Sequence, residues 1–306
     1  MDEQAVLKAN GLVEAFLKTA RRPLVVLLGP TASGKTQLSL DLASLFDGEI
    51  ISADSRQVYR QMDIGTDKVP LEKRKIVPHH MIDIVDPDER FTTADYKQMT
   101  EKTIDEVLAK KRIPFLVGGT GLYLRTITQN FSLAGESQNL EIRKKLEEEL
   151  NALGGKVLHD RLRELDPAAA DKVHPNNRHH LLRALEIVML TGKPKSAAAG
   201  TSESKYDVLK IGLSVPRDEL YRRINERVDE QIKNGLVEET KKLLEKYPAT
   251  LQSMQTLGYS EIVQYLNGEL TLEQAIAFIK QNTRHFAKRQ TTWFRKEADV
   301  HWLKLA

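Results

Sequence analysis

Short hydrophobic runs in the first part of the chain predict the strands of a parallel sheet. Leu24 to Leu28, Glu49 to Ser52 and Ile113 to Val117 are rich in branched aliphatic side chains. They are also short and continuous, the pattern of strands that are covered on both faces. Amphipathic spacing predicts helices between them at 35–46 and 92–111. Alternation of strands and helices predicts an α/β sheet with helices on its faces.

The pattern changes near residue 131, where helical periodicity continues but strand signals stop. A helix is also expected at 1–20, before the first strand, and another apolar run at 206–215 predicts a return to the sheet. A helical domain at 131–204 would therefore be inserted into a core formed by 1–130 and 205–306, the last part of it mostly helical. Within the insertion we expect helices at 140–153, 157–165 and 177–191, followed by a connection at 192–204. The final, mostly helical stretch is expected at 217–296.

Composition excludes several classes of protein. The 306 residues include 46 Lys or Arg against 43 Asp or Glu, so a net charge of +3 does not by itself indicate a nucleic-acid partner. Cysteine is absent, which excludes disulfides, thiol nucleophiles and thiolate metal sites and suits a reducing compartment. Without a signal peptide or a membrane-length apolar run, we expect a cytoplasmic protein with no membrane association.

A phosphate-binding motif follows the first predicted strand directly. It reads G-x-x-x-x-G-K-T and opens the next predicted helix, which is the context that a P-loop requires. Its backbone N–H groups and the helix N-terminus would surround a diphosphate, Lys35 would add a point charge, and the Thr36 hydroxyl would hold Mg²⁺. Such a loop recognises phosphate and not a base. The residues of the motif are Gly29, Pro30, Thr31, Ala32, Ser33, Gly34, Lys35 and Thr36.

The carboxylate that a P-loop ATPase uses to hold its metal is missing from the expected strand. Ile113 to Val117 runs into the glycine-rich turn Gly118 to Gly121 instead, which argues against a polymer-moving motor. Asp54 follows the other strand at its carboxyl end, beside the phosphate loop in a sheet of this type. An Asx-turn would explain an Asp at this position equally well, so its role depends on the surrounding residues.

Several segments together resemble the tRNA dimethylallyltransferases, also called tRNA isopentenyltransferases, and the absence of cysteine favours the bacterial form. The order and the spacing of these segments match the family over nearly the whole chain. They are 29–36, 54–59, 62–66, 77–83, 118–123, 183–186, 257–261 and 283–290.

The resemblance implies an enzyme that transfers a dimethylallyl group from dimethylallyl pyrophosphate to the exocyclic N6 amine of the adenosine 3′ to the anticodon, with Mg²⁺. It implies that Asp54 is the general base and that Thr120 orients the reacting groups. It also implies two sets of ligands. The diphosphate ligands would be Gly29, Thr31, Ala32, Ser33, Gly34, Lys35, Thr36 and Arg217, with Thr36 on the metal. The tRNA ligands would be Asp54, Ser55, Arg56, Gln57, Arg143, Arg284 and Lys288.

A charge run near the C-terminus also favours RNA. Residues 280–296 contain six Lys or Arg and no acid, and Lys280, Arg284 and Lys288 repeat on one helical face. A solvated helix face would look the same. Because the protein as a whole is nearly neutral, we expect this face to contact the anticodon stem-loop.

Three other functions remain open from the residues alone. A small-molecule or nucleoside kinase would use the same P-loop and Mg²⁺, with Asp54 accepting a hydroxyl proton. A prenyltransferase acting on free adenine nucleotides would share the diphosphate pocket but lack the inserted helices and the basic face. A non-enzymatic RNA-binding module would leave the P-loop and Asp54 without a purpose. We expect no obligatory protein partner.

Overall fold

The computed structural model describes residues 3–130, 140–194 and 204–305. The chain divides into two compact units: a core unit, Met1–Thr128 with Ser204–Ala306, and a helical unit, Gln129–Glu203. Most of the connection expected at 192–204 lies outside the described residues, as do residues 131–139.

Within the described residues, the core unit contains a six-stranded sheet in which every neighbouring pair is parallel, in the order β3-β2-β4-β1-β5-β6. The α/β fold with a parallel sheet is thereby confirmed. The edge strands β3 and β6 have no counterpart among the predicted strands. The strands are β1 (Pro23–Leu28), β2 (Gly48–Ala53), β3 (His79–His80), β4 (Ile113–Gly118), β5 (Asp207–Ser214) and β6 (Val300–Lys304).

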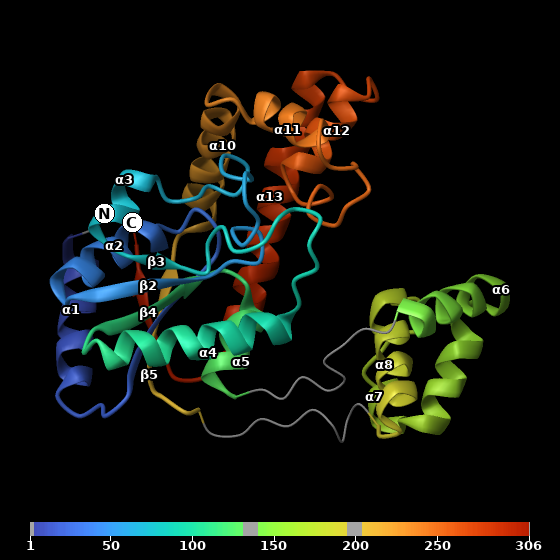
Figure 1. Cartoon of the computed structure of the whole chain (residues 1–306), viewed down its shortest axis with the longest axis horizontal. Coiled ribbons are helices and arrows are strands. Elements are labelled where there is room, and N and C mark those ends of the chain that lie inside the picture. Colours follow the sequence, from blue (N-terminus) through green and yellow to red (C-terminus); the bar gives the residue numbers. More distant parts are fainter. Residues whose placement is uncertain (1–2, 131–139, 195–203, 306) are drawn as a thin grey trace. The chain divides into compact units, whose positions relative to one another are not determined.

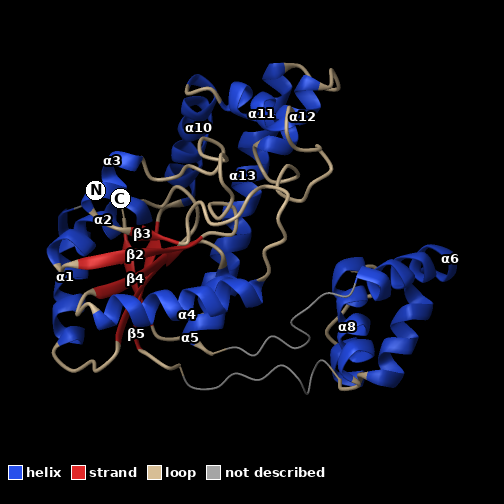
Figure 2. Cartoon of the chain, viewed as in Figure 1, coloured by secondary structure: helices blue, strands red, loops and turns tan. Residues whose placement is uncertain are grey.

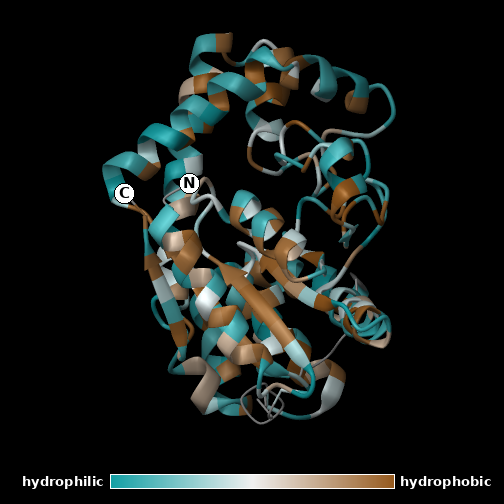
Figure 3. Ribbon diagram, turned by 90° about the vertical axis from the view of Figure 1, so that its left-hand side faces the viewer, coloured by the Kyte–Doolittle hydropathy of each residue, from teal (hydrophilic) through white to brown (hydrophobic). Residues whose placement is uncertain are grey.

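Helices cover both faces of this sheet (Figure 1, Figure 2). Two of them, α1 (Glu3–Leu17) and α2 (Lys35–Leu45), enclose a hydrophobic core on one face. On the opposite face, α4 (Thr93–Ala109) and α5 (Gly121–Thr128) enclose a second core. Figure 3 shows hydrophobic strands between helices whose outer faces are hydrophilic. Burial on both faces explains why β1 and β4 are nearly continuous apolar runs.

The carboxyl ends of β1, β2 and β4 meet at one edge of the sheet. β1 leads into α2 through the phosphate loop, where Gly34 has φ 90°, a conformation that favours glycine. At the end of β4, a Cβ on Gly118 would lie 2.1 Å from the carbonyl oxygen of Ala53 in β2. The second glycine-rich turn therefore lies directly against the end of β2, beside Asp54.

The C-terminal helices form a third hydrophobic cluster above this edge, together with Met62 from the loop after β2. Helix α13 is the longest of them and carries Phe294 back into the core beneath the sheet. Its first turn is fixed by a capping box between Thr271 and Gln274. The helices in this part of the chain are α10 (Arg217–Lys233), α11 (Leu236–Leu244), α12 (Tyr259–Leu266) and α13 (Leu272–Phe294); the short α3 (Leu71–Ile76) precedes β3.

The core of the helical unit consists of leucines from α6 (Leu140–Leu165) and α8 (Arg178–Thr191), with two alanines from α7 (Pro167–Ala170). Helix α6 is interrupted at Gly154, which has φ 83° and ψ 163°, so it corresponds to the two helices predicted on either side of that residue. No strand occurs among the described residues of this unit. In the part of the chain with described coordinates, no helix combines the length and hydrophobicity needed to cross a bilayer.

Candidate active site

A cavity of about 450 Å³ opens beside the phosphate loop, at the carboxyl edge of the sheet. One side is formed by residues 31–36 of that loop, and the opposite side by α10. Asp54, Gln57, Gly118 and Gly119 also line it. We call this space the donor cavity.

The phosphate loop is folded as a cradle for an anion. The Lys35 ammonium donates to the carbonyl of Pro30 at 2.7 Å, so in the free protein it bonds the loop itself. The Ser33 hydroxyl is completely buried and has no hydrogen-bond partner in the described part of the chain. A buried hydroxyl without a partner is costly unless a ligand bonds it. Both groups line the donor cavity, which suits a phosphate oxygen.

Lys35 is an unusual lysine because its ammonium is shielded from solvent although the residue is only half-buried. Burial lowers its pKa to about 8, and the nearby Asp54 carboxylate opposes part of that shift. At neutral pH the ammonium is therefore charged, but it is held in a site that disfavours the charge until an anion arrives.

The two carboxylate oxygens of Asp54 have different environments. Its Oδ1 accepts a hydrogen bond from the backbone N–H of Arg56 at 2.9 Å, so the Asx-turn that the sequence allowed is present. Its other oxygen has no hydrogen-bond partner among the described residues, and the side chain lines the donor cavity. The turn therefore holds the carboxyl group in place and leaves Oδ2 available to a ligand.

Thr120 lies beside Asp54 but is not among the residues that line the donor cavity. Its Oγ1 accepts from the backbone N–H of Ser55 at 3.0 Å and lies 3.3 Å from the Ser55 hydroxyl. Thr120 thus ties the second glycine-rich turn to the segment after β2, where Asp54 lies.

Gln290 of α13 joins the two glycine-rich loops, a role that the sequence did not reveal. Its Oε1 accepts from the backbone N–H of Thr31 at 2.8 Å, and its Nε2 donates to the carbonyl of Gly119 at 2.9 Å. The side chain is 7% exposed. The available signal was a polar residue at a buried position of an amphipathic helix.

The arginines of α10 that face the donor cavity are Arg223 and Arg227. Arg217, the expected diphosphate ligand, is exposed at the start of the helix and lies over the ring of Tyr221, 5.1 Å from its centroid. Arg217 does not line the cavity, so the geometry of the described residues gives the expectation no support. Arg223 and Arg227, six and ten positions later, lie on the side of α10 that faces the phosphate loop.

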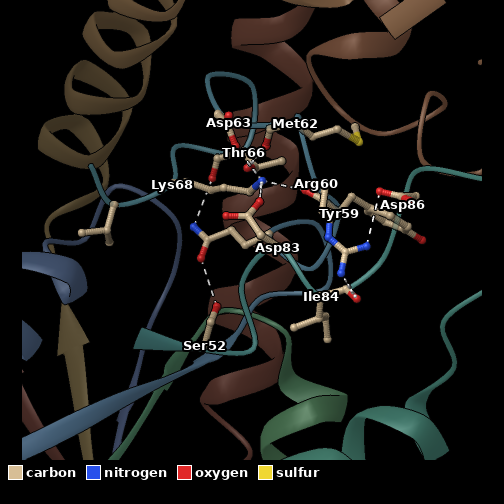
Figure 4. A network of polar contacts seen from close by, with 12 residues as sticks. Ser52, Tyr59, Arg60, Met62, Asp63, Thr66, Lys68, Asp83, Ile84 and Asp86 are labelled. Carbon is tan, nitrogen blue, oxygen red and sulfur yellow. Dashed lines mark hydrogen bonds and ion pairs between the residues drawn. The ribbon is translucent and has the colours of Figure 1, made fainter. Parts of the chain in front are cut away.

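A buried ammonium fixes the loop that follows Asp54 (Figure 4). The Lys68 side chain is 2% exposed and its Nζ contacts the carbonyl of Tyr59 at 2.6 Å, Asp63 at 2.7 Å and Asp83 at 2.6 Å. Gln57 is held by the hydroxyl of Ser52 and the carbonyl of Thr66, at 3.0 and 3.2 Å. These bonds order the loop before any ligand binds.

A carboxylate from α11 holds the same loop from the other side. Glu239 accepts hydrogen bonds from the backbone N–H groups of Asp63, Ile64 and Gly65, at 2.9 to 3.2 Å, and from the Tyr259 hydroxyl at 2.6 Å. Burial raises the pKa of Tyr259, which keeps that hydroxyl protonated as a donor. The motif residues around Gly65 and Tyr259 therefore have a structural role.

The remaining expected tRNA ligands are dispersed. Arg56 lies over the ring of Phe286, 5.1 Å from its centroid. Arg284 donates to Asn225 of α10 at 2.8 Å, and Lys280 is paired with Asp229. Two of the three basic residues expected on one open face thus contact α10.

Arg143 lies in the helical unit, on α6, and is held there by acidic neighbours. Its Nε donates to Glu147 at 2.9 Å, and its Nη1 lies 3.8 Å from Glu186 of α8. Its side chain is only 18% exposed, so much of it serves the packing of this unit.

Lys288 opens onto a second depression of about 570 Å³ in the core unit. We call it the basic cleft. The exposed Trp293 forms part of it, with the Arg125 guanidinium 4.9 Å from the centroid of the indole ring. The lining residues are Arg125, His285, Lys288, Arg289, Thr292, Trp293 and Lys296.

Known proteins are similar to this chain over most of its length. A family model described as IPP transferase matches residues 57–297. The tRNA dimethylallyltransferase of Symbiobacterium thermophilum is 50% identical over 285 residues, which cover 92% of this chain and 89% of that protein. The one from Halalkalibacterium halodurans is 46% identical over 288 residues, covering 93% and 92%.

Solved structures of related enzymes are also similar to this chain. The full-length tRNA isopentenylpyrophosphate transferase of Bacillus halodurans matches with a TM-score of 0.70 and 46% identity, over 93% of this chain and 90% of that one. A eukaryotic dimethylallyltransferase, described in crystallographic snapshots as acting on tRNA, matches with a TM-score of 0.80 and 30% identity, over 92% of this chain and 74% of that one. The resemblance carried by the sequence motifs is confirmed: this chain belongs to the IPP transferase family, the tRNA dimethylallyltransferases.

Proposed function

We propose that this enzyme transfers a dimethylallyl group from dimethylallyl pyrophosphate to N6 of the adenosine 3′ to the anticodon of a tRNA. The observation that carries the proposal is the pairing of two groups in the donor cavity. Lys35 and the buried Ser33 hydroxyl suit a diphosphate, and the available oxygen of Asp54 lines the same cavity. A leaving-group site and a proton acceptor are what an allylic transfer to an amine requires.

The reaction breaks the bond between C1 of the donor and its pyrophosphate oxygen, and the electron pair leaves with pyrophosphate. Lys35, the loop amides and the Ser33 hydroxyl would stabilise the charge that develops there. Arg223 and Arg227 lie across the cavity and would add to this. A new bond forms from N6 to C1, and Asp54 takes the proton that N6 loses.

The oxygen ligands at the phosphate loop suit Mg²⁺, held in the way that phosphate-binding enzymes hold it. In the described residues, no group of three or more His, Cys, Asp or Glu is arranged to hold a metal. Mg²⁺ commonly uses one or two protein oxygens and completes its shell with phosphate oxygens and water. The exposed Thr36 hydroxyl at the start of α2 would be that protein ligand. When bound, the ion neutralises charge on the leaving pyrophosphate.

The acceptor would come from the side of the basic cleft. Gly119 lines the donor cavity, whereas a Cβ on Gly121 would lie 2.2 Å from the indole nitrogen of Trp293, in the basic cleft. Thr120 joins these two glycines, which supports a position for this residue between the two depressions. Gln290 and Arg289 are likewise consecutive residues that line one depression each. A base extruded from an RNA loop held by these cations could reach Asp54.

The experiment that tests the proposal compares acceptors. Purified enzyme, Mg²⁺ and dimethylallyl pyrophosphate are incubated with unmodified tRNA, AMP or ATP, and the products are digested and analysed by mass spectrometry. We expect the gain of one dimethylallyl group on adenosine from tRNA alone. Transfer to free nucleotides at a comparable rate would instead identify an enzyme acting on adenylates.

The pKa of Lys35 predicts how donor binding depends on pH. Because that pKa is about 8, the free protein loses the Lys35 proton as the pH rises through 8, and a bound pyrophosphate would restore it. Binding above pH 8 should therefore take up a proton and weaken by at most about tenfold per pH unit. Calorimetry with magnesium pyrophosphate in buffers of different ionisation enthalpy measures the uptake. Lys35→Gln should remove the share of the proton uptake that comes from Lys35. If the proton uptake is unchanged in this variant, another group takes up the proton.

The basic cleft predicts the salt dependence of tRNA binding. Lys288→Ala combined with Arg289→Ala removes two exposed charges and should lower the slope of log affinity against log salt by about one to two. The control is Lys18→Ala with Lys102→Ala, two exposed lysines, one just after α1 and one on α4. If both double variants give the slope of the unaltered enzyme, the cleft does not contact phosphates.

A further inference from the structure

The donor cavity has two chemically different ends. The phosphate loop and α10 make one end polar and charged, where Arg223 and Arg227 lie beside Glu226 and Glu230. Four aliphatic side chains, Ile50, Val69, Ile82 and Val117, also line the cavity, beside polar residues of the segment that follows β2. The prenyl donor has the same division, since its charged diphosphate is joined to a hydrocarbon.

The register of the sheet explains how the apolar end is built. Ser52 of β2 lies opposite Val117 of β4, and Ile50 of β2 lies opposite His79 of β3. Paired residues on neighbouring strands project from the same face, and so do residues two apart on one strand. Ile50, Ser52, Val117 and His79 therefore form a continuous floor, in which the Ser52 hydroxyl is already bonded to Gln57. Because β3 is the last strand on this side of the sheet, His79 is where the floor ends.

The His79 ring presents an uncharged surface to the cavity. Its Nδ1 donates to the carbonyl of Val77 at 2.7 Å, which leaves Nε2 without a proton in the neutral ring. That Nε2 is buried and has no hydrogen-bond partner in the described part of the chain, and the residue lines the cavity. Burial lowers the pKa of His79, which favours the neutral form.

We propose that the floor formed by Ile50, Val117 and His79 holds the hydrocarbon of the prenyl donor, and that the His79 ring limits the length of the chain that fits. This inference rests on the proposed function. With the diphosphate fixed at Lys35, a chain that extends along the floor meets the imidazole at the edge of the sheet. Val69 and Ile82 close the sides.

A smaller residue at 79 should therefore admit a donor with one more isoprene unit. Transfer from geranyl pyrophosphate makes and breaks the same bonds: C1 leaves its pyrophosphate oxygen, N6 bonds C1, and the N6 proton goes to Asp54. Only the size of the hydrocarbon differs. In an apolar pocket, one extra or missing methylene group changes the relative kcat/KM of two substrates by about 10- to 200-fold.

The test measures kcat/KM for geranyl and dimethylallyl pyrophosphate with unmodified tRNA, in the full chain with Mg²⁺. His79→Ala should raise the ratio of geranyl to dimethylallyl transfer by at least about tenfold. His79→Leu keeps most of the volume and should keep the ratio of the unaltered enzyme. His301→Ala, an exposed histidine on β6 at the opposite edge of the sheet, is the matched control and should change nothing. Ile82→Ala, from the side of the cavity, should shift the ratio in the same direction as His79→Ala.

Other outcomes would overturn the inference. If His79→Ala and Ile82→Ala fold and transfer dimethylallyl groups with an unchanged ratio, the hydrocarbon does not lie on this floor. If His79→Leu loses activity as severely as His79→Ala, with no gain for the longer donor, His79 acts through its nitrogen and not through its size. An unaltered enzyme that transfers neither group would contradict the proposed function itself.

Discussion

Replacing Asp54 by asparagine should reduce turnover by a factor of about 10² to 10⁴, the usual contribution of a general base. The amide oxygen can still accept the hydrogen bond from the Arg56 N–H, so the Asx-turn and the loop around it should persist. The adenine amine would then have no group to take its proton as the new bond forms. Single-turnover rates with saturating tRNA and donor measure the effect, and tRNA affinity should stay within a few-fold of the original.

Asp54→Ala separates the chemical role from the structural one, because it removes the turn as well as the carboxylate. We expect both variants to lose turnover to a similar extent. If Asp54→Asn is nearly as active as the unaltered enzyme while Asp54→Ala is not, Asp54 acts by shaping the loop and another group accepts the proton.

Lys35→Gln should lower kcat/KM for the donor by a factor of about 10² to 10³, the range seen when one group that stabilises developing negative charge is removed. It should also weaken the binding of magnesium pyrophosphate. Stability should not fall, since burial already disfavours the ammonium in the free protein. Steady-state kinetics, calorimetry and thermal unfolding give the three quantities, with the exposed Lys18→Gln as the control. A variant that unfolds more easily but keeps donor binding would show that Lys35 supports the loop and not the leaving group.

The central strands could be predicted from the sequence because burial on both faces produces an unmistakable pattern. β1 and β4 are nearly continuous apolar runs for this reason, and β2 and β5 each contain buried aliphatic residues with a few polar ones between or beside them. The edge strands lack it: β3 is only His79 and His80, and its identity depends on pairing with β2. β6 alternates buried and exposed residues after a helix and is equally weak as a local signal.

The site could be predicted where one local segment builds it, and not where distant segments meet. The phosphate loop is such a segment, since its function depends on its own backbone. On α10, by contrast, the choice among Arg217, Arg223 and Arg227 depends on the rotation of the helix against the cavity. The same limit applies to α13, where Arg284 bonds Asn225 of α10 although the sequence placed it on an open face.

The groups that hold the site together were the least visible in the sequence. Gln290 bonds residues that lie more than 150 positions away along the chain, and Glu239 bonds backbone atoms of a distant loop. Such contacts carry no motif of their own, because the partner atoms are backbone groups that every residue has. Only the fold brings them together.

The central claim is that the cradle around Lys35 holds the leaving group of a hydrocarbon donor. The most direct measurement supplies the enzyme with Mg²⁺, unmodified tRNA, dimethylallyl pyrophosphate labelled in its carbon chain and ATP labelled in its terminal phosphate, and then maps both labels in the RNA. The account predicts the carbon label on N6 of the adenosine 3′ to the anticodon, release of unlabelled pyrophosphate and no labelled phosphate in any product. Phosphate label transferred to an acceptor, with no carbon label on the RNA, would contradict it.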